Sequence, residues 1–189
     1  MLHALELVPD TAGQEVVLRD WQALREAGLP SQLDHRGESN APHLTLVSAD
    51  SVTGLVDRAV ELIGPLLPVQ VRASGLLLLG RHRLTVARSV DVPDALVAAV
   101  LALRADAGDL PHQGWLPHLT LSRRLPRAEA QRTVDVLGAD DVVLRLDTLR
   151  RWDPDEKLIE LLASPPVQTG PPPGVGQVTP HGNGGSTGG

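Results

Sequence analysis

The sequence predicts a mixed fold of helices and strands, built as two similar halves related by a pseudo-twofold axis. The string Pro-His-Leu-Thr-Leu occupies residues 42–46 and returns, letter for letter, at 117–121. The elements expected around each copy follow one order: strand, helix, motif strand, helix, strand, strand. The 42% of hydrophobic and 21% of charged residues are typical of a soluble globular protein. A pseudo-twofold axis between the halves would bring the two copies together.

The first half is expected to begin with a strand over residues 2–8. A capping box of Thr11 and Gln14 begins a helix that ends at Gly28, and a polar loop then leads to the first motif copy. Ser51 caps a second helix, and strands over 69–73 and 75–79 follow. The apolar face of that second helix comprises Leu55, Ala59, Leu62 and Leu66.

The second half repeats this order after a tight connection at residues 80–82. A strand over 83–88 precedes a helix with Pro93 in its first turn, and a loop containing His112 leads to the second motif copy. Pro126 begins a fourth helix, and two strands end the domain, over residues 142–149 and 158–163. We therefore predict one domain, 1–163, with lobes of roughly 1–80 and 83–163.

Residues 164–189 differ from the rest of the chain. These 26 residues contain no Asp, Glu, Lys or Arg, and 14 of them are Gly or Pro. Such a segment cannot bury enough apolar surface to offset the entropy of ordering, so a disordered Gly/Pro-rich tail is predicted.

The charge and the composition exclude several classes of protein. A net charge of −6 argues against a protein that wraps long duplex nucleic acid, so a nucleic-acid substrate is expected to be short. The absence of cysteine excludes disulfides and thiolate chemistry. No stretch is apolar enough to span a membrane, and the first residues lack the pattern of a signal peptide. We expect a cytoplasmic monomer.

The repeated motif carries groups suited to phosphate chemistry. Residues two apart on a strand share a face, so His43 and Thr45 point one way while the leucines of the motif point into a core. His118 and Thr120 repeat this arrangement. A neutral and a protonated imidazole supply a general base and a general acid near neutral pH. The threonine hydroxyls would donate hydrogen bonds to phosphate oxygens, so the chemistry needs no metal and no cofactor.

Two His-x-Thr motifs in the halves of a chain of this size resemble the 2H phosphoesterase superfamily. The second copy, followed by Ser122 and Arg123, is similar to the bacterial branch of 2′-5′ RNA ligases and RNA 2′,3′-cyclic phosphodiesterases. The resemblance covers roughly residues 1–163. It implies a bilobal α+β fold, with helices outside two antiparallel sheets that line a central cleft. It also implies metal-independent opening of 2′,3′-cyclic phosphates on RNA ends or nucleotides, and the reverse joining of ends through a 2′-5′ bond.

The family's catalytic residues carry over to His43, Thr45, His118 and Thr120, and the resemblance favours the second histidine as the base. For phosphate binding, the resemblance favours Arg123, whereas strict alternation along the strand puts Arg124 on the histidine face. Trp115 would either stack on a base or, as the preferred interpretation, pack beneath the strand. The place of Trp152 stays open, and His35, His82 and His112 are read as solvated loop residues.

Two alternative functions share this site. One is a module that binds a terminal phosphate or a nucleotide without turnover. The other is a hydrolase of a nucleotide metabolite, such as ADP-ribose cyclic phosphate. The lack of Phe and Tyr leaves three tryptophans as the large aromatic side chains, which puts base recognition in question.

Overall fold

The computed structural model describes residues 2–35, 37 and 40–165. The predicted tail thus lies almost wholly outside the described residues. Within them, seven strands and four α-helices alternate with short 3-10 turns. The strands are β1 (His3–Pro9), β2 (Leu44–Ala49), β3 (Val69–Leu79), β4 (Arg83–Asp91), β5 (His118–Pro126), β6 (Val142–Asp153) and β7 (Leu158–Ala163), and the helices are α1 (Thr11–Glu26), α2 (Val56–Ile63), α3 (Asp94–Asp106) and α4 (Ala130–Leu137).

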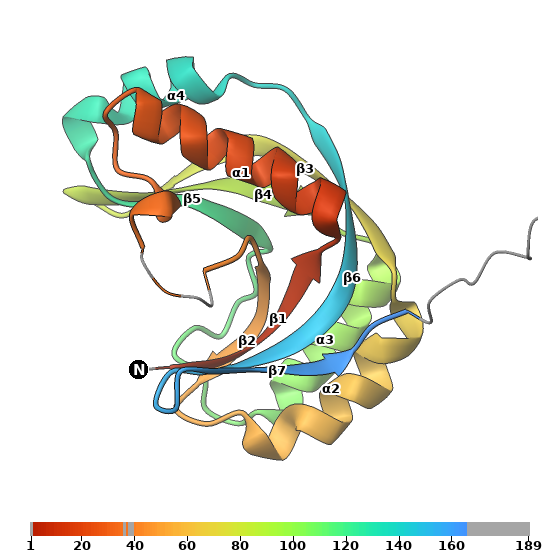
Figure 1. Ribbon diagram of the computed structural model, residues 1–189. Helices are drawn as coiled ribbons and strands as arrows, with labels where there is room; N and C mark the ends of the chain where they lie inside the picture. The colour runs from red at the N-terminus through yellow and green to blue at the C-terminus, as the bar shows by residue number, and fades with distance from the viewer. Residues whose placement is uncertain (1, 36, 38–39, 166–189) are drawn as a thin grey trace, which may run out of the picture.

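All seven strands belong to one strongly curved antiparallel sheet, with the order β1-β2-β5-β4-β3-β6-β7. Strand β6 also pairs with β1, so the sheet closes on itself. The first part of β6 pairs with β3 and its last part with β7, and in Figure 1 this long strand sweeps from the α1 side of the molecule to the α2 side. The predicted α+β class with antiparallel pairing is confirmed. One continuous sheet stands in place of the two sheets that the family resemblance implied, because β2 pairs with β5.

The pairing obeys the predicted pseudo-twofold symmetry. The symmetry exchanges β1 with β4, β2 with β5 and β3 with β6. It therefore relates the β1–β2 pair to a β4–β5 pair, and the β1–β6 pair to a β4–β3 pair. The structure contains all four of these pairs. The helices obey it too, because α1 packs with α4 and α3 packs with α2. Figure 1 shows the two helix pairs on opposite sides of the sheet.

The two halves of the chain exchange elements. Helix α1 of the first half packs on β5 of the second half, and α3 of the second half packs on β2 of the first. Each lobe of the folded chain consists of one helix pair and the part of the sheet that it covers. Each lobe therefore combines segments from before and after the connection near residue 80. This exchange ties the two motif strands into one rigid unit.

The leucines of both motif copies are core residues, as the alternation predicts. Leu44, Leu46 and Leu121 are 0% exposed and Leu119 is 1% exposed. They belong to one hydrophobic cluster that also includes Trp21 of α1. Burying a leucine side chain contributes about 1.5–3 kcal/mol, so the four together anchor the motif strands.

Local details differ from the predictions in three places. Asp10, not Thr11, caps α1, since its side chain accepts a 2.8 Å hydrogen bond from the amide of Gly13. The two strands expected over 69–79 are one strand with a bulge at Gly75, where φ is +29°. The strand expected to end at residue 149 continues to Asp153, because β7 and β1 both pair with its last part.

Candidate functional site

The two motif strands are antiparallel neighbours that meet at one residue pair. Leu44 of β2 lies directly opposite Leu119 of β5, and each is the central residue of its motif copy. The pseudo-twofold axis therefore passes between these two leucines. Both leucines are buried, and side chains alternate along a strand. The histidine and the threonine that flank each leucine thus point to the opposite face of the sheet. Both motif strands share that face.

This pairing places the motif quartet (His43, Thr45, His118 and Thr120) on a single face. The four side chains are each partly exposed. Diagonal neighbours across an antiparallel pair lie about 7–8 Å apart, and the two histidines stand in this diagonal relation. That separation leaves room for a phosphate group between the two imidazoles.

The same bulge follows the threonine in both motif strands. The register of β1 with β2 shifts between Leu5 and Glu6, so that Leu46 has no directly opposite partner. The register of β4 with β5 shifts between Val86 and Ala87, so that Leu121 likewise has no directly opposite partner. Bulges redirect side chains next to functional sites. Here the first bulge brings Glu6 opposite Thr45, and the second brings Ala87 opposite Thr120.

Both imidazoles are oriented by the same hydrogen bond. Nδ1 of His43 lies 2.7 Å from the carbonyl oxygen of Ala41, and Nδ1 of His118 lies 2.7 Å from that of Leu116. A carbonyl oxygen only accepts hydrogen bonds, so Nδ1 carries a proton in each ring. Nε2 is therefore the nitrogen left for proton transfer in both histidines.

The surroundings of the two histidines differ. Oε1 of Glu6 lies 3.4 Å from Nε2 of His43, and Oε2 of Glu6 accepts bonds of 2.8 Å from Nε and Nη2 of Arg150. The side chains of Glu6 and Arg150 are only 5% and 8% exposed. Among the described residues, no carboxylate contacts His118. Sequence reasoning missed this pair, although Glu6 is the one acidic residue of the first strand.

Two tryptophans from different parts of the chain hold equivalent points of the two motif strands. Nε1 of Trp21 in α1 donates a 3.1 Å hydrogen bond to the carbonyl of Thr120, and Nε1 of Trp115 donates one of 3.0 Å to that of Thr45. Trp115 is partly buried and packs against the core. Its indole is thus fixed to the backbone of β2. Packing beneath the strands, the preferred sequence interpretation of Trp115, agrees with these contacts.

Arg123 and Arg124 lie at the outer end of β5, where a second bulge interrupts the pairing with β4. Both side chains are exposed, and Arg124 has φ +60°. The carbonyl of Arg124 accepts a 3.1 Å bond from Arg83. Within the described part of the chain, neither guanidinium of the pair makes a hydrogen bond or an ion pair. The bulge breaks the strict alternation from which Arg124 was expected to face the histidines.

The register also places residues beyond the motif on the shared face. Opposite residues of paired strands present their side chains on one side of a sheet. Glu6 lies opposite Arg150, and Trp152 lies two positions further along β6, so all three share a face. Trp152 is partly exposed, so it borders the Glu6–Arg150 pair. At the pseudo-equivalent positions of the other half stand Leu77 and Leu79.

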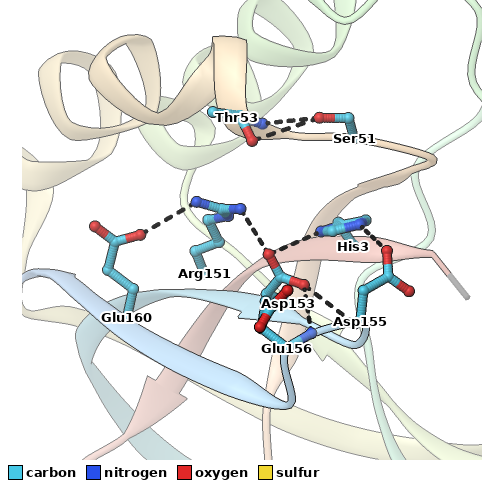
Figure 2. Close-up of polar contacts among 8 residues, drawn as sticks. All are labelled: His3, Ser51, Thr53, Arg151, Asp153, Asp155, Glu156 and Glu160. Atoms are coloured by element: carbon cyan, nitrogen blue, oxygen red, sulfur yellow. Dashed lines mark hydrogen bonds and ion pairs between the residues drawn. The ribbon is translucent and has the colours of Figure 1, made fainter.

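A second polar cluster ties the start of β1 to the turn between β6 and β7. Figure 2 shows His3 between two carboxylates. Nε2 of His3 lies 3.1 Å from Oδ2 of Asp155, and Nδ1 lies 3.6 Å from Oδ2 of Asp153. Arg151 binds the same oxygen of Asp153 at 2.8 Å. Hydrogen bonds from the amides of Glu156 and Asp155, with the charges of His3 and Arg151, lower the pKa of Asp153.

His3, Asp153 and Asp155 also form the group of described residues best placed to hold a metal ion. The direct contact of His3 with Asp155 and the guanidinium of Arg151 beside Asp153 fit an ion-pair cluster better than a metal centre. The cluster thus fixes the end of the sheet, on strands that also carry Glu6 and Arg150.

The remaining predicted candidates lie outside the motif face. His35, His82 and His112 are exposed in connecting segments. A cavity of about 480 Å³ between the start of α1 and β6 is lined by apolar and polar residues, but by none of the motif quartet. Within the described ranges, no helix is long and apolar enough to cross a membrane.

Three solved structures have a similar overall arrangement. They are the MHV ns2 PDE domain (15% identity, TM-score 0.44, covering 77% of this chain and 98% of that one), a phosphoesterase (18%, 0.49, 85% and 93%) and E. coli LigT complexed with NADP+ (16%, 0.45, 85% and 92%).

No curated protein matches the chain by sequence. A family model described as the 2′-5′ RNA ligase superfamily matches residues 9–158. The match spans both motif copies and all eleven helices and strands in whole or in part. The chain therefore belongs to the 2′-5′ RNA ligase superfamily, a group of 2H phosphoesterases.

Proposed function

We propose that the chain is a metal-independent phosphodiesterase that opens 2′,3′-cyclic phosphates on short RNA ends or on nucleotides. One observation carries this proposal above all: the Leu44–Leu119 pairing puts both His-x-Thr motifs on one face, and the carbonyl contact of each Nδ1 leaves Nε2 as the nitrogen for proton transfer. Two imidazoles on diagonal neighbours of paired strands suit a reaction in which one takes a proton and the other gives one.

In the proposed reaction, Nε2 of His118 accepts a proton from water as the water oxygen forms a new bond to phosphorus. The bond from phosphorus to one ribose oxygen breaks, and Nε2 of His43 donates its proton to that oxygen. The product is a monophosphate with a free neighbouring hydroxyl. His118 then carries the extra proton and His43 is neutral, and exchange with solvent restores the starting state.

The threonines and arginines would stabilise charge on the phosphate. The hydroxyls of Thr45 and Thr120 would donate to the two non-bridging oxygens, where negative charge increases in the transition state. Removal of one such donor in other enzymes costs about 10²–10³ in kcat. Arg123 and Arg124, whose guanidinium groups have no partner among the described residues, are the candidates for holding the phosphate of an RNA end.

The proposed substrates are small, because the chain has a net charge of −6 and lacks the basic surplus that binds long nucleic acid. One chain contains the complete motif quartet, so the proposed enzyme works as a monomer. Joining of RNA ends through a 2′-5′ bond would be the same chemistry in reverse, with a ribose hydroxyl in place of water.

The decisive experiment is a panel of 2′,3′-cyclic nucleotides, short RNAs ending in a cyclic phosphate, 2′-5′-linked RNAs and ADP-ribose cyclic phosphate. Reactions are run in EDTA, and the product isomers are identified. We expect a single monophosphate isomer. Tight binding of these compounds without turnover would instead support the binding module, and hydrolysis of only the ADP-ribose compound would support the metabolite hydrolase.

A further inference from the structure

We propose that five arginines at one end of the motif face form a surface that holds the phosphate backbone of an RNA strand behind its reacting end. We call this surface the arginine patch, and it consists of Arg81, Arg83, Arg123, Arg124 and Arg127, all exposed. The inference rests on the proposed phosphodiesterase function. It narrows the substrate from nucleotides in general to the 3′ ends of short RNA strands.

The arginine patch lies where the hairpin of β3 and β4 meets the end of β5. Arg83, the first residue of β4, lies opposite Pro126, the last residue of β5. Arg81 belongs to the hairpin turn, and Arg127 begins the 3-10 turn that follows β5. In Figure 1 the hairpin extends on the side of the molecule that carries α4, away from the start of α1.

The strand register puts the patch on the same face as the motif quartet. Leu84 and Leu125 lie opposite each other and are 1% and 0% exposed, so both point into the core. Arg83, next to Leu84, therefore points to the other face of the sheet. Ser122 is also 0% exposed, and Arg123 follows it on the face of the quartet. The patch thus continues the motif face outward, over roughly 7–20 Å beyond the second motif copy by the strand rise.

The positive charge of the patch is not compensated. Residues 80–83 and 118–127 contain five arginines and no acidic residue, in a chain with a net charge of −6. None of the five guanidinium groups forms an ion pair among the described residues. Glu129, the acidic residue next along the chain, binds Arg132 instead. Seven arginines elsewhere each pair with a carboxylate: Arg25, Arg58, Arg72, Arg88, Arg132, Arg150 and Arg151.

Two hydrogen bonds hold these like charges together. Nη1 of Arg83 donates to the carbonyl of Arg124 at 3.1 Å, and Nη1 of Arg127 donates to the carbonyl of Arg81 at 3.3 Å. Both bonds connect the hairpin with the end of β5 or the turn behind it. A guanidinium has five N–H donors, so each of these side chains keeps most of its donors for a ligand. Guanidinium groups bind phosphate oxygens in bidentate fashion.

An RNA strand matches the patch in charge and in direction. A 2′,3′-cyclic phosphate is the 3′ end of a strand, so the remaining nucleotides must leave the site when that phosphate lies between the motif histidines. Their phosphates repeat along the strand and meet the repeated positive charges of the patch. Contacts to phosphates carry no base preference. The chain should therefore prefer RNA of several nucleotides to a cyclic mononucleotide, whatever the base sequence.

The test compares an RNA of about ten nucleotides, ending in a 2′,3′-cyclic phosphate, with a 2′,3′-cyclic mononucleotide. The double variant Arg81→Gln with Arg127→Gln removes two charges at the end of the patch farther from the motif. The ratio of kcat/KM for the RNA to kcat/KM for the mononucleotide should fall about 2- to 25-fold, since each exposed contact contributes roughly 1.5- to 5-fold. Misfolded protein lowers both rates equally and leaves the ratio intact. An unchanged ratio would overturn the proposal.

The control removes the same charge from exposed arginines outside the patch. Arg19 lies on α1 and Arg145 on β6, and neither side chain forms an ion pair within the described ranges. The carbonyl of Arg145 binds the amide of Asp10 before α1, far from the hairpin turn. Arg19→Gln with Arg145→Gln should keep the native ratio. An equal fall in this variant would show an effect of net charge alone and would overturn the assignment to the patch.

A second readout does not depend on turnover. Binding of an RNA of the same length, ending in a 3′-phosphate that cannot be opened, is measured against salt. Each lost phosphate contact should lower the slope of log Kd against log salt by about 0.7, in the patch variant and not in the control. RNA binding that depends on the patch, without turnover of any substrate, supports the surface and contradicts the proposed function alone. Binding of phosphatidylserine vesicles that needs the patch, with RNA binding unchanged, would overturn the inference.

Discussion

Leu44 of β2 faces Leu119 of β5 across the pseudo-twofold axis, and this pair is the point at which the two halves of the chain meet. Each leucine is flanked by a histidine and a threonine, and each is buried beneath a helix from the opposite half. The pair thus joins the packing of the core to the geometry of the candidate site.

Removal of either motif histidine should abolish turnover. His43→Ala and His118→Ala should each lower kcat/KM by at least about 10³-fold, because the acid and the base act in one step. The double variant should lose little more than each single one. Initial rates with a 2′,3′-cyclic nucleotide provide the measurement, and His82→Ala, in the exposed hairpin turn, provides the control. A single variant that keeps near-native activity would remove that histidine from the mechanism.

The indole of Trp115 should matter through its hydrogen bond to Thr45. Trp115→Phe keeps a ring but removes the donor, and it should lower the free energy of unfolding by about 0.5–1.5 kcal/mol. Trp21→Phe, which removes the symmetric bond to Thr120, is the matched variant and should cost a similar amount. Chemical denaturation measures both. If Trp115→Phe leaves stability intact but raises KM strongly, the ring stacks on substrate instead.

Arg123 and Arg124 should contribute to substrate binding and little to stability. Both side chains are exposed and without partners in the described residues, so alanine at either position should change the free energy of unfolding by less than about 0.5 kcal/mol. The arginine that holds the phosphate should raise KM about tenfold or more when replaced, and the KM of the native chain should rise with salt. Unchanged KM in both variants would exclude the pair from the site.

Acid should weaken the cluster of His3, Asp153 and Asp155. The amide of Glu156, the amide of Asp155 and the nearby positive charges lower the pKa of Asp153 in the folded chain. Its stabilising effect is therefore complete above the unfolded pKa of about 3.9 and is lost as the pH falls through the lower folded value. Asp153→Asn should reduce the melting temperature at pH 7.

The pH dependence distinguishes this effect from general loss of packing. The difference in melting temperature between the native chain and Asp153→Asn should shrink as the pH is taken below about 4. Glu160→Gln, at an exposed partner of Arg151, serves as the comparison and should have a small effect at every pH. A constant difference across the pH range would contradict the role of the Asp153 charge.

The repeated motif and its periodicity predicted most of the secondary structure. Alternation predicted that Leu44, Leu46, Leu119 and Leu121 are buried, and all four are. The helical spacing of Leu55, Ala59, Leu62 and Leu66 predicted the inner face of the second helix, where the first two are buried and the last two pack partly buried against the same core. These features depend on residues near one another in the chain, and local geometry alone determines which side chains share a face.

Bulges and caps were harder to predict because each depends on a single residue or a distant neighbour. Thr11 with Gln14 matches the capping pattern, but Asp10 reaches the amide of Gly13 and caps the helix. The bulge at the end of β5 gives Arg124 a positive φ and breaks the alternation on which its orientation was inferred. Nothing in the sequence of β5 alone specifies how many residues its partner strand supplies.

The sequence by itself determined the presence of two identical His-x-Thr motifs and the common face of the histidine and the threonine on each strand. Only the tertiary structure decided how the surroundings of the two motifs differ. Glu6 and Arg150 are 144 residues apart, and they meet because β1 pairs with the distant β6 as well as with β2. A charge next to one histidine of an identical pair follows from long-range strand pairing, which no local pattern encodes. The symmetry of the motif belongs to the sequence, and its asymmetry to the fold.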